Sequence, residues 1–205
     1  MSIVIVDYGS GNLLSIANML RKVGCPNVTI SGGPDEIEKA DKLILPGVGH
    51  IDHGMKGLRQ ANLIDVLNDK VIDKQTPVLG ICLGLQLMTE KSEEGMSKGL
   101  GWLEATTIAF DKNRMNGEKL PHMGWAEIKY NRSHPLFKGL GPDPRFYFVH
   151  GYHVTTENKN LILCKADYGY DFTAGLFREN IMAVQFHPEK SHKFGMKIMK
   201  NFAEL

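Results

Sequence analysis

The feature that most constrains the fold is an alternation, along the first half of the chain, of short apolar runs with segments of helical periodicity. Residues 3–6 are an unbroken run of Ile and Val, which is typical of a strand buried on both faces. Residues 12–23 place apolar side chains at helical spacing, and Gly24 follows where a helix would end. The same reasoning predicts strands at 28–30, 42–45 and 77–81, and helices at 34–40 and about 55–72.

This order of elements predicts one α/β domain built around a mostly parallel sheet. Strands joined through helices are parallel neighbours, so helices are expected on both faces. After about residue 100 the pattern changes to short strand-like segments separated by turns, which indicates an antiparallel extension of the sheet. These segments are residues 105–110, 125–130, 145–149, 154–156, 161–164 and 174–177. A buried strand at 181–186 and an amphipathic helix at 193–205 follow, and no repeat or linker divides residues 1–205.

Composition and charge argue against several function classes. The chain has 24 Lys and Arg against 23 Asp and Glu, so its formal charge of +1 gives no reason to expect nucleic acid or a membrane surface as a partner. No apolar stretch approaches the roughly 20 residues that span a bilayer, and the N-terminal run lacks the basic leader of a signal peptide. The three cysteines are odd in number and far apart, which favours free thiols and a cytoplasmic location. We expect neither a metal site nor a cofactor.

Residues 80–84, Gly-Ile-Cys-Leu-Gly, are the sharpest local signal for chemistry. They have the form of a nucleophile elbow, a tight turn from a strand into a helix that exposes the central side chain above the sheet edge. Cys82 would lie at a helix N-terminus, where the helix dipole favours the thiolate. The N–H of Leu83 would point toward an oxyanion formed by attack at Cys82. An isolated cysteine is more often structural, and we interpret Cys25 and Cys164 in that way.

Among the eight histidines, His187 is the best candidate for the base that a thiol nucleophile needs. It follows the apolar run 182–186, so it is expected at the end of a strand, where functional groups gather in open α/β sheets. Glu189 comes two residues later, and residues i and i+2 share a face in extended backbone. A carboxylate there can bond one imidazole nitrogen and leave the other for the thiol. Such a pair alone is common on surfaces, and its combination with Cys82 makes it informative.

A second oxyanion donor is expected from the backbone of Val48 and Gly49, in the Pro-Gly-Val-Gly turn at residues 46–49. A glycine-flanked turn can present an N–H inward, and this turn lies one strand–helix unit before the elbow. The residues alone leave three other interpretations open. The chain can be a cysteine hydrolase of other substrates, a non-catalytic scaffold, or a nucleotide- or flavin-binding module that uses the turn at residues 9–12. That turn lacks the third glycine of the dinucleotide fingerprint.

Taken together, these motifs resemble those of the class I glutamine amidotransferases, and the likeness covers the whole chain. Residues 80–86 (GICLGLQ) match the family's nucleophile motif, and residues 185–191 (QFHPEKS) match its histidine–glutamate motif. The resemblance implies a flavodoxin-like α/β fold and a triad of Cys82, His187 and Glu189. Cys82 would form a thioester with the acyl group of glutamine and release ammonia, and water would then yield glutamate.

The resemblance also implies which residues recognise the substrate. The side chain of Gln86 and the backbone of Val48 and Gly49 would line a pocket for glutamine. Glu94, within the run Ser-Glu-Glu at residues 92–94, would bind the α-amino group of glutamine.

Within the family, four further motifs are similar to those of glutaminases that pass ammonia to a (β/α)₈-barrel cyclase subunit in histidine biosynthesis, as a heterodimer. They are residues 7–12 (DYGSGN), 45–50 (LPGVGH), 121–125 (PHMGW) and 147–150 (YFVH). The positions that would face such a cyclase are Asn12, Trp125 and Lys190. Two positions depart from that pattern, since Ala126 stands where asparagine is usual and Gly151 where serine is common. Residues 191–196 resemble a paralogous branch that supplies ammonia for surface amino sugars, so this second pathway stays open as an alternative.

Overall fold

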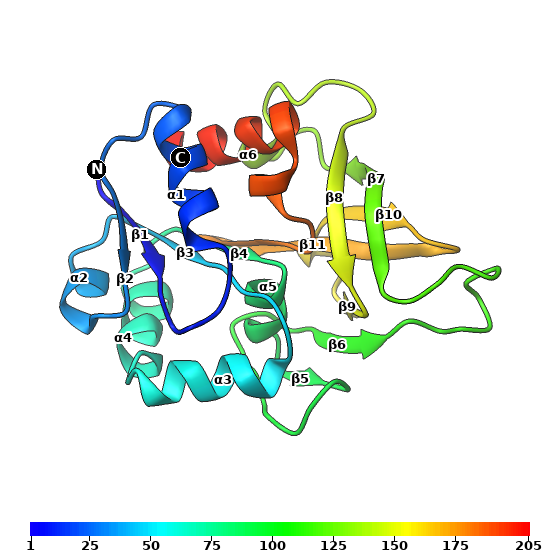
Figure 1. The fold of residues 1–205 in the computed structure, drawn as a ribbon, viewed down its shortest axis with the longest axis horizontal. Coiled ribbons are helices and arrows are strands. Elements are labelled where there is room, and N and C mark those ends of the chain that lie inside the picture. Colours follow the sequence, from blue (N-terminus) through cyan, green and yellow to red (C-terminus); the bar gives the residue numbers. More distant parts are fainter.

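A twelve-stranded sheet runs through the structure, a computed structural model that describes residues 1–205. Its main path has the order β2-β1-β3-β4-β12-β11-β10-β7-β8, and β5, β6 and β9 form a short ladder attached to β11 (Figure 1). The strands are β1 (Ile3–Val6), β2 (Val28–Ser31), β3 (Lys42–Leu45), β4 (Val78–Ile81), β5 (Lys91–Ser92), β6 (Thr106–Ala109), β7 (His122–Tyr130), β8 (Arg145–His150), β9 (Tyr152–Thr155), β10 (Ile162–Asp167), β11 (Asp171–Arg178) and β12 (Ile181–Val184).

The first five strands of this path are parallel. β1 pairs with β2 and β3, and β4 pairs with β3 and β12. Every residue of β1, β3, β4 and β12 is buried, because helices cover both faces of this half of the sheet, which explains why these segments are almost wholly apolar. The order is that of a flavodoxin-like doubly wound sheet, so the predicted fold class is confirmed.

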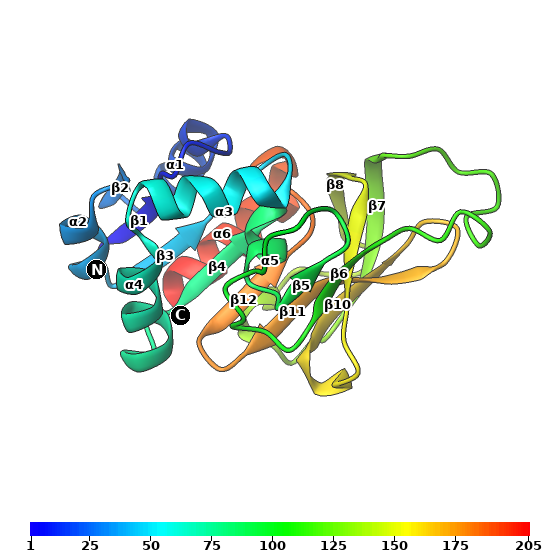
Figure 2. The ribbon, with the colours of Figure 1, turned by 90° about the horizontal axis from the view of Figure 1, so that it is seen from below.

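The other half of the path is antiparallel. β11 pairs with β12 and β10, and β7 pairs with β10 and β8. Figure 2 shows these strands extending away from the end of the molecule that carries β2. Exposed and buried residues nearly alternate along β7 and β8, because one face of this pair lacks a covering helix. The predicted antiparallel extension is therefore confirmed, with strand boundaries that differ from the predicted ones by a few residues.

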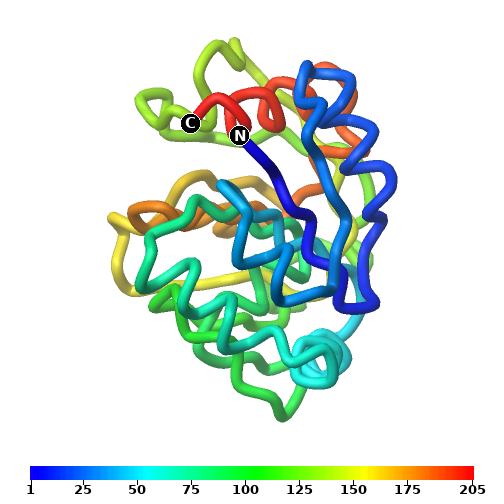
Figure 3. Tube along the Cα trace, turned by 90° about the vertical axis from the view of Figure 1, so that its left-hand side faces the viewer, coloured from blue at the N-terminus to red at the C-terminus, as the bar shows by residue number.

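Two buried clusters lie on opposite faces of the sheet. One contains apolar side chains of α1 and α6, and the other contains those of α2, α3, α4 and α5. Figures 1 and 3 show α1 and α6 on one side and α3 and α4 on the other. The helices are α1 (Leu13–Lys22), α2 (Pro34–Glu38), α3 (Ile51–Gln60), α4 (Ile64–Asn68), α5 (Leu83–Leu87) and α6 (His192–Glu204).

The single helix predicted for residues 55–72 is wrong. The segment contains two α-helices, α3 and α4, followed by a π-helical turn (Asp69–Asp73). Asn62 separates α3 from α4 with a φ of +54°, a left-handed conformation that no α-helix contains and that asparagine tolerates better than most residues. The break lets Leu58, Leu63 and Leu67 all reach the same buried cluster.

The structure also describes the state of the cysteines, the length of the helices and the grouping of metal-binding side chains. Cys25, Cys82 and Cys164 are free thiols. The longest helix is α6, and none combines the length and apolar character that crossing a bilayer requires. No group of three or more His, Cys, Asp or Glu side chains has an arrangement that would hold a metal ion.

Candidate functional site

Cys82 occupies the turn between β4 and α5, at the carboxyl end of a parallel strand. Its φ of 53° and ψ of −107° are unusual for a residue with a side chain, and its N–H donates to the Val184 carbonyl at 2.8 Å. Position 84 requires glycine, because a Cβ on Gly84 would collide with the Leu45 carbonyl oxygen. The turn thus has the strained strand-to-helix geometry expected of a nucleophile elbow.

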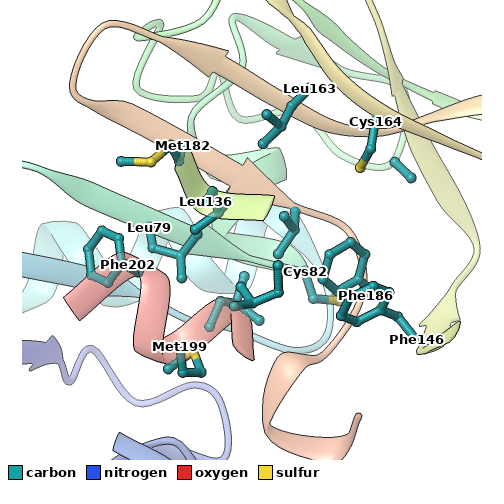
Figure 4. Close-up of a cluster of buried hydrophobic side chains, with 14 of the residues drawn as sticks. Leu79, Cys82, Leu136, Phe146, Leu163, Cys164, Met182, Phe186, Met199 and Phe202 are labelled. Carbon is teal, nitrogen blue, oxygen red and sulfur yellow. The ribbon is translucent and has the colours of Figure 1, made fainter. Parts of the chain in front are cut away.

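The side chain of Cys82 lies at the boundary between the core and a small cavity. It belongs to the buried cluster shown in Figure 4, which includes the stacked rings of Phe146 and Phe186. Its Sγ lies 3.9 Å from the Val149 carbonyl oxygen and 3.7 Å from Nε2 of Gln185. Cys82 is 6% exposed, so a molecule that fills the cavity can reach the sulfur.

His187 follows β12 and forms a buried pair with Glu189. Nδ1 of His187 lies 2.7 Å from Oε1 of Glu189, and each side chain is 2% exposed. A short 3₁₀ helix (Pro188–Lys190) folds Glu189 back onto His187, so the contact arises from a turn and not from the extended backbone that the sequence suggested. A carboxylate only accepts, so Nδ1 carries a proton, and Nε2 is left buried without a hydrogen-bond partner.

Opposing effects set the ionisation of His187. Burial disfavours the imidazolium and by itself would lower the pKa of His187. The Cys82 sulfur and the Glu189 carboxylate outweigh it, because both stabilise a positive ring, and the pKa of His187 is raised above its usual range. A protonated imidazole beside a cysteine is the arrangement that can activate a thiol as a nucleophile.

The predicted oxyanion donors are engaged elsewhere in this conformation. The Leu83 N–H donates to the Gly47 carbonyl at 3.4 Å. The Val48 N–H donates to Ser10 Oγ at 3.0 Å, and the Ser10 hydroxyl donates to the Val48 carbonyl at 2.8 Å. Both N–H groups therefore bond other acceptors in this conformation, and their role as oxyanion donors stays a prediction. The physical reason is that the loop after β3 packs against the loop after β1. Ser10 lies in the loop after β1 and bonds the backbone of Val48.

A cavity of about 140 Å³ opens beside Cys82. Gln86 reaches it from α5, and Glu94 reaches it from the loop after β5. Oε2 of Glu94 accepts from the Ile51 N–H at 2.9 Å, which fixes the carboxylate at the start of α3. The other lining residues are Val48, Gly49, Leu83, Val149, His150, Gly151 and Tyr152. The structure thus brings the predicted substrate-binding residues to the nucleophile, in a space far below the roughly 300–1,000 Å³ of typical drug-sized sites.

The residues expected to face a partner lie on exposed surface close to the Cys82–His187 site. Asn12 caps α1, which packs against the 3₁₀ helix that carries Lys190. Nζ of Lys190 lies 5.5 Å from the centroid of the Tyr147 ring, and Trp125 contacts the same ring edge-on. Trp125 is 47% exposed and stacks on His192, the first residue of α6.

Sequence reasoning missed two residues that contact the site. Ser10 bonds both polar groups of Val48, and Gln185 approaches the Cys82 sulfur. Gln185 carried a usable signal, because it is a polar residue inside an otherwise apolar run and is 0% exposed. Ser10 carried none, because its partner is 38 residues away in the chain.

Comparison with known proteins gives the family. Residues 4–205 match the family described as glutamine amidotransferase class-I. The imidazole glycerol phosphate synthase subunit HisH 2 of Pseudomonas aeruginosa is 47% identical over 203 residues, which cover 99% of this chain and 99% of that protein. The subunit of the same name from Methanococcus maripaludis is 51% identical over 200 residues, which cover 98% of each chain.

Solved structures show the same fold at low identity. A putative GMP synthase protein from Thermoplasma acidophilum has a TM-score of 0.74 and 21% identity, with 100% of this chain and 92% of that chain covered. The glutaminase domain of CTPS from Trypanosoma brucei has a TM-score of 0.68 and 16% identity, with 100% and 94% covered. Because the family match spans nearly all of its residues and its relatives are this similar over their full length, the chain belongs to the class I glutamine amidotransferases.

Proposed function

We propose that this chain hydrolyses glutamine to glutamate and ammonia, and passes the ammonia to a cyclase subunit that makes imidazole glycerol phosphate in histidine biosynthesis. The observation that carries the proposal is the small cavity in which the strained Cys82 meets Gln86 and Glu94. The relatives that share 47% and 51% identity over almost the whole chain are named as subunits of imidazole glycerol phosphate synthase, which supports the pathway.

The geometry supports a two-step acyl transfer. The Cys82 thiolate attacks the side-chain amide carbon of glutamine, and the His187 imidazolium gives its Nε2 proton to the departing nitrogen, so ammonia leaves and a thioester remains. The now neutral Nε2 takes a proton from water, which attacks the thioester carbonyl. Glutamate leaves, and the proton on Nε2 restores the thiolate–imidazolium pair. Glu189 keeps Nδ1 protonated and stabilises the imidazolium throughout.

Substrate recognition follows from the charge and polarity of the cavity. The Glu94 carboxylate is positioned to bind the α-ammonium group of glutamine, which an ester or a peptide bond inside a chain would not offer. The Nε2 of Gln86 bonds the Tyr152 carbonyl and Gln185, so its Oε1 is the atom available to a ligand. A cysteine hydrolase of larger substrates is disfavoured because the cavity is small.

The assay that tests this proposal compares three substrate classes. The purified chain is incubated with glutamine, with simple ester substrates and with short peptides, and the released products are quantified. We expect glutamate and ammonia in equal amounts from glutamine, and negligible turnover of the others. Turnover of esters or peptides at a rate similar to that of glutamine would favour the cysteine hydrolase.

We further propose that the ammonia acceptor is a (β/α)₈-barrel cyclase bound to the surface around Asn12, Trp125 and Lys190, as a heterodimer. This surface lies next to the Cys82–His187 site, so ammonia released there would have a short path to a bound partner. Ammonia is mostly protonated near neutral pH, and a direct path would keep it reactive. The free thiols support a cytoplasmic location within the same proposal.

A synthase of surface amino sugars is the second candidate for the acceptor. The observation that favours it is the contact between Trp125 and His192, since His192 belongs to the segment that resembles the amino-sugar branch. Ala126, where asparagine is usual, lies beside Trp125 on the same strand. Glutamine hydrolysis is common to both candidates, and only the partner differs.

Replacing Trp125 with alanine is expected to weaken assembly with the cyclase. A half-exposed aromatic ring is a typical anchor of an interface, and its loss commonly costs about 2 kcal/mol, or roughly 30-fold in Kd. Isothermal titration of the cyclase with each variant measures the change. Ile72→Ala is the matched control, because Ile72 is 40% exposed on the π-helical turn, away from this surface. Equal affinities for the Trp125→Ala variant and the unmodified chain would contradict this assignment.

Replacing Glu189 with glutamine is expected to slow hydrolysis by about a hundredfold at saturating glutamine. The amide keeps the size of the carboxylate and can still accept from Nδ1, but it no longer stabilises a charged ring. The pKa of His187 should therefore fall in this variant, because one of the groups that raise it is gone. Turnover assays and an NMR titration of the His187 ring measure the two effects. Unchanged turnover would reduce the triad to a dyad of Cys82 and His187.

A further inference from the structure

A chain of buried polar side chains ends on the sulfur of Cys82. Gln185 is 0% exposed, and its Nε2 lies 3.7 Å from the Cys82 Sγ. Its Oε1 accepts from Nε2 of Gln86 at 3.3 Å. The same Nε2 of Gln86 donates to the Tyr152 carbonyl at 3.4 Å, which also accepts from Nδ1 of His150 at 2.7 Å. These contacts link β8 and β9 to the nucleophile through two side-chain amides.

The backbone carbonyl of Tyr152 fixes the orientation of both amides. A carbonyl oxygen only accepts, so the side chain of Gln86 must present its NH₂ group to Tyr152. That NH₂ group then requires an acceptor on Gln185, which turns Oε1 of Gln185 toward Gln86. The NH₂ group of Gln185 is consequently left facing the Cys82 sulfur. Reversal of either amide would set two oxygens or two NH₂ groups against each other in a buried space.

Besides His187, two polar groups lie near the sulfur, and they act on opposite protonation states. The Val149 carbonyl, 3.9 Å away, can only accept a hydrogen bond, so it favours the thiol. The Gln185 N–H donates, and a hydrogen bond to an ionised acceptor is stronger than one to a neutral acceptor, so it favours the thiolate. We propose that Gln185 is a catalytic residue that stabilises the Cys82 thiolate, held in its donating orientation by Gln86. This inference rests on the proposed function, because it assigns Gln185 a role in that same reaction.

Alkylation of Cys82 measures the thiolate without requiring glutamine or a partner. In a Cys25→Ala background, the rate of reaction with iodoacetamide is followed across pH, and the modified cysteine is located by mass spectrometry. Replacing Gln185 with methionine keeps a side chain of similar length but removes the donor. We expect alkylation of Cys82 near neutral pH to slow by about tenfold, the effect of losing one weak charge-assisted hydrogen bond. At about pH 10, where an accessible thiol is ionised in any case, the two proteins should react alike.

Two further observations keep the test decisive. Cys164 is buried in the core, so its alkylation reports unfolding, and a variant in which it stays unmodified is folded. If methionine is not tolerated, Gln185→Glu preserves the shape but sets an oxygen against the sulfur, and alkylation of Cys82 near neutral pH should fall at least as far. An unchanged pH profile in a folded variant would overturn the role of Gln185. The proposed function fails by a different result, which is glutamine turnover that survives the loss of Cys82.

Discussion

Replacing Cys82 with alanine is expected to abolish glutamine hydrolysis, by on the order of 10⁵-fold or more, while the chain remains folded. Without the sulfur no thioester can form, and neither His187 nor Glu189 offers another nucleophile at that point of the cavity. The substitution removes one atom from a side chain that lies at the cavity edge, so the core should lose little packing. Release of glutamate and ammonia measures the activity, and a thermal unfolding curve measures the fold.

Cys25→Ala is the matched control for this experiment. Cys25 is a free, partly buried thiol that packs against the cluster beneath α1, outside the cavity beside Cys82. Its replacement should leave turnover within about twofold of the unmodified chain, because a surface-proximal substitution of this size perturbs stability only slightly. Substantial hydrolysis by the Cys82→Ala variant would remove Cys82 from its proposed role and with it the whole thioester route.

The fold was predictable because burial leaves its signature in local sequence. Strands β1 and β3 coincide with their predicted ranges, since both are buried on two faces and so consist almost entirely of apolar residues. The break between α3 and α4 was not predictable in the same way. The pattern of apolar residues continues through Asn62, and only the packing of Leu63 and Leu67 against the sheet decides that the chain must turn there.

The site was predictable only where its parts lie close together in sequence. The elbow at Cys82 and the His187–Glu189 pair are local motifs, so their residue types and spacing indicate the chemistry. The contact between Gln185 and Cys82 spans 103 residues, and it depends on β12 pairing with β4. A single sequence does not reveal the partner of such a contact, so the polar Gln185 within an apolar run marked an unusual position without indicating that it meets Cys82.

One peptide unit connects the two predicted oxyanion donors, Val48 and Leu83. The Gly47 carbonyl and the Val48 N–H belong to one planar peptide unit, in which they point in opposite directions. Rotation of that unit would take the carbonyl off the Leu83 N–H and bring the Val48 N–H toward the sulfur. Ser10 opposes the rotation, because its hydroxyl oxygen accepts a hydrogen bond from the Val48 N–H, which belongs to that unit. Ser10 lies two residues before Asn12, which we propose to face the partner, so we expect partner binding to weaken this restraint.

The isolated chain should therefore hydrolyse glutamine slowly, and its synthase subunit with acceptor substrate bound should raise the rate by about a hundredfold to a thousandfold. That range is the effect of one oxyanion donor in other hydrolases. The glutaminase assay is run on this chain alone, then with the barrel cyclase, and then with an amino-sugar synthase, each with its acceptor substrate. Full activity without a partner would contradict the coupling between partner binding and glutamine hydrolysis. Stimulation only by the amino-sugar synthase would keep the mechanism and change the pathway.

Ser10→Ala provides the internal test of this mechanism, because it releases the Val48 peptide without any partner. Loss of the hydrogen bond from the Val48 N–H, worth about 1 kcal/mol, is expected to raise the basal rate about fivefold and to reduce the stimulation by the cyclase correspondingly. Ser133→Ala is the matched control, since Ser133 lies in an exposed turn and bonds only Asn131. A basal rate that stays low in the Ser10→Ala variant would mean that another contact, such as the Leu83–Gly47 hydrogen bond, holds the Gly47–Val48 peptide in its present orientation.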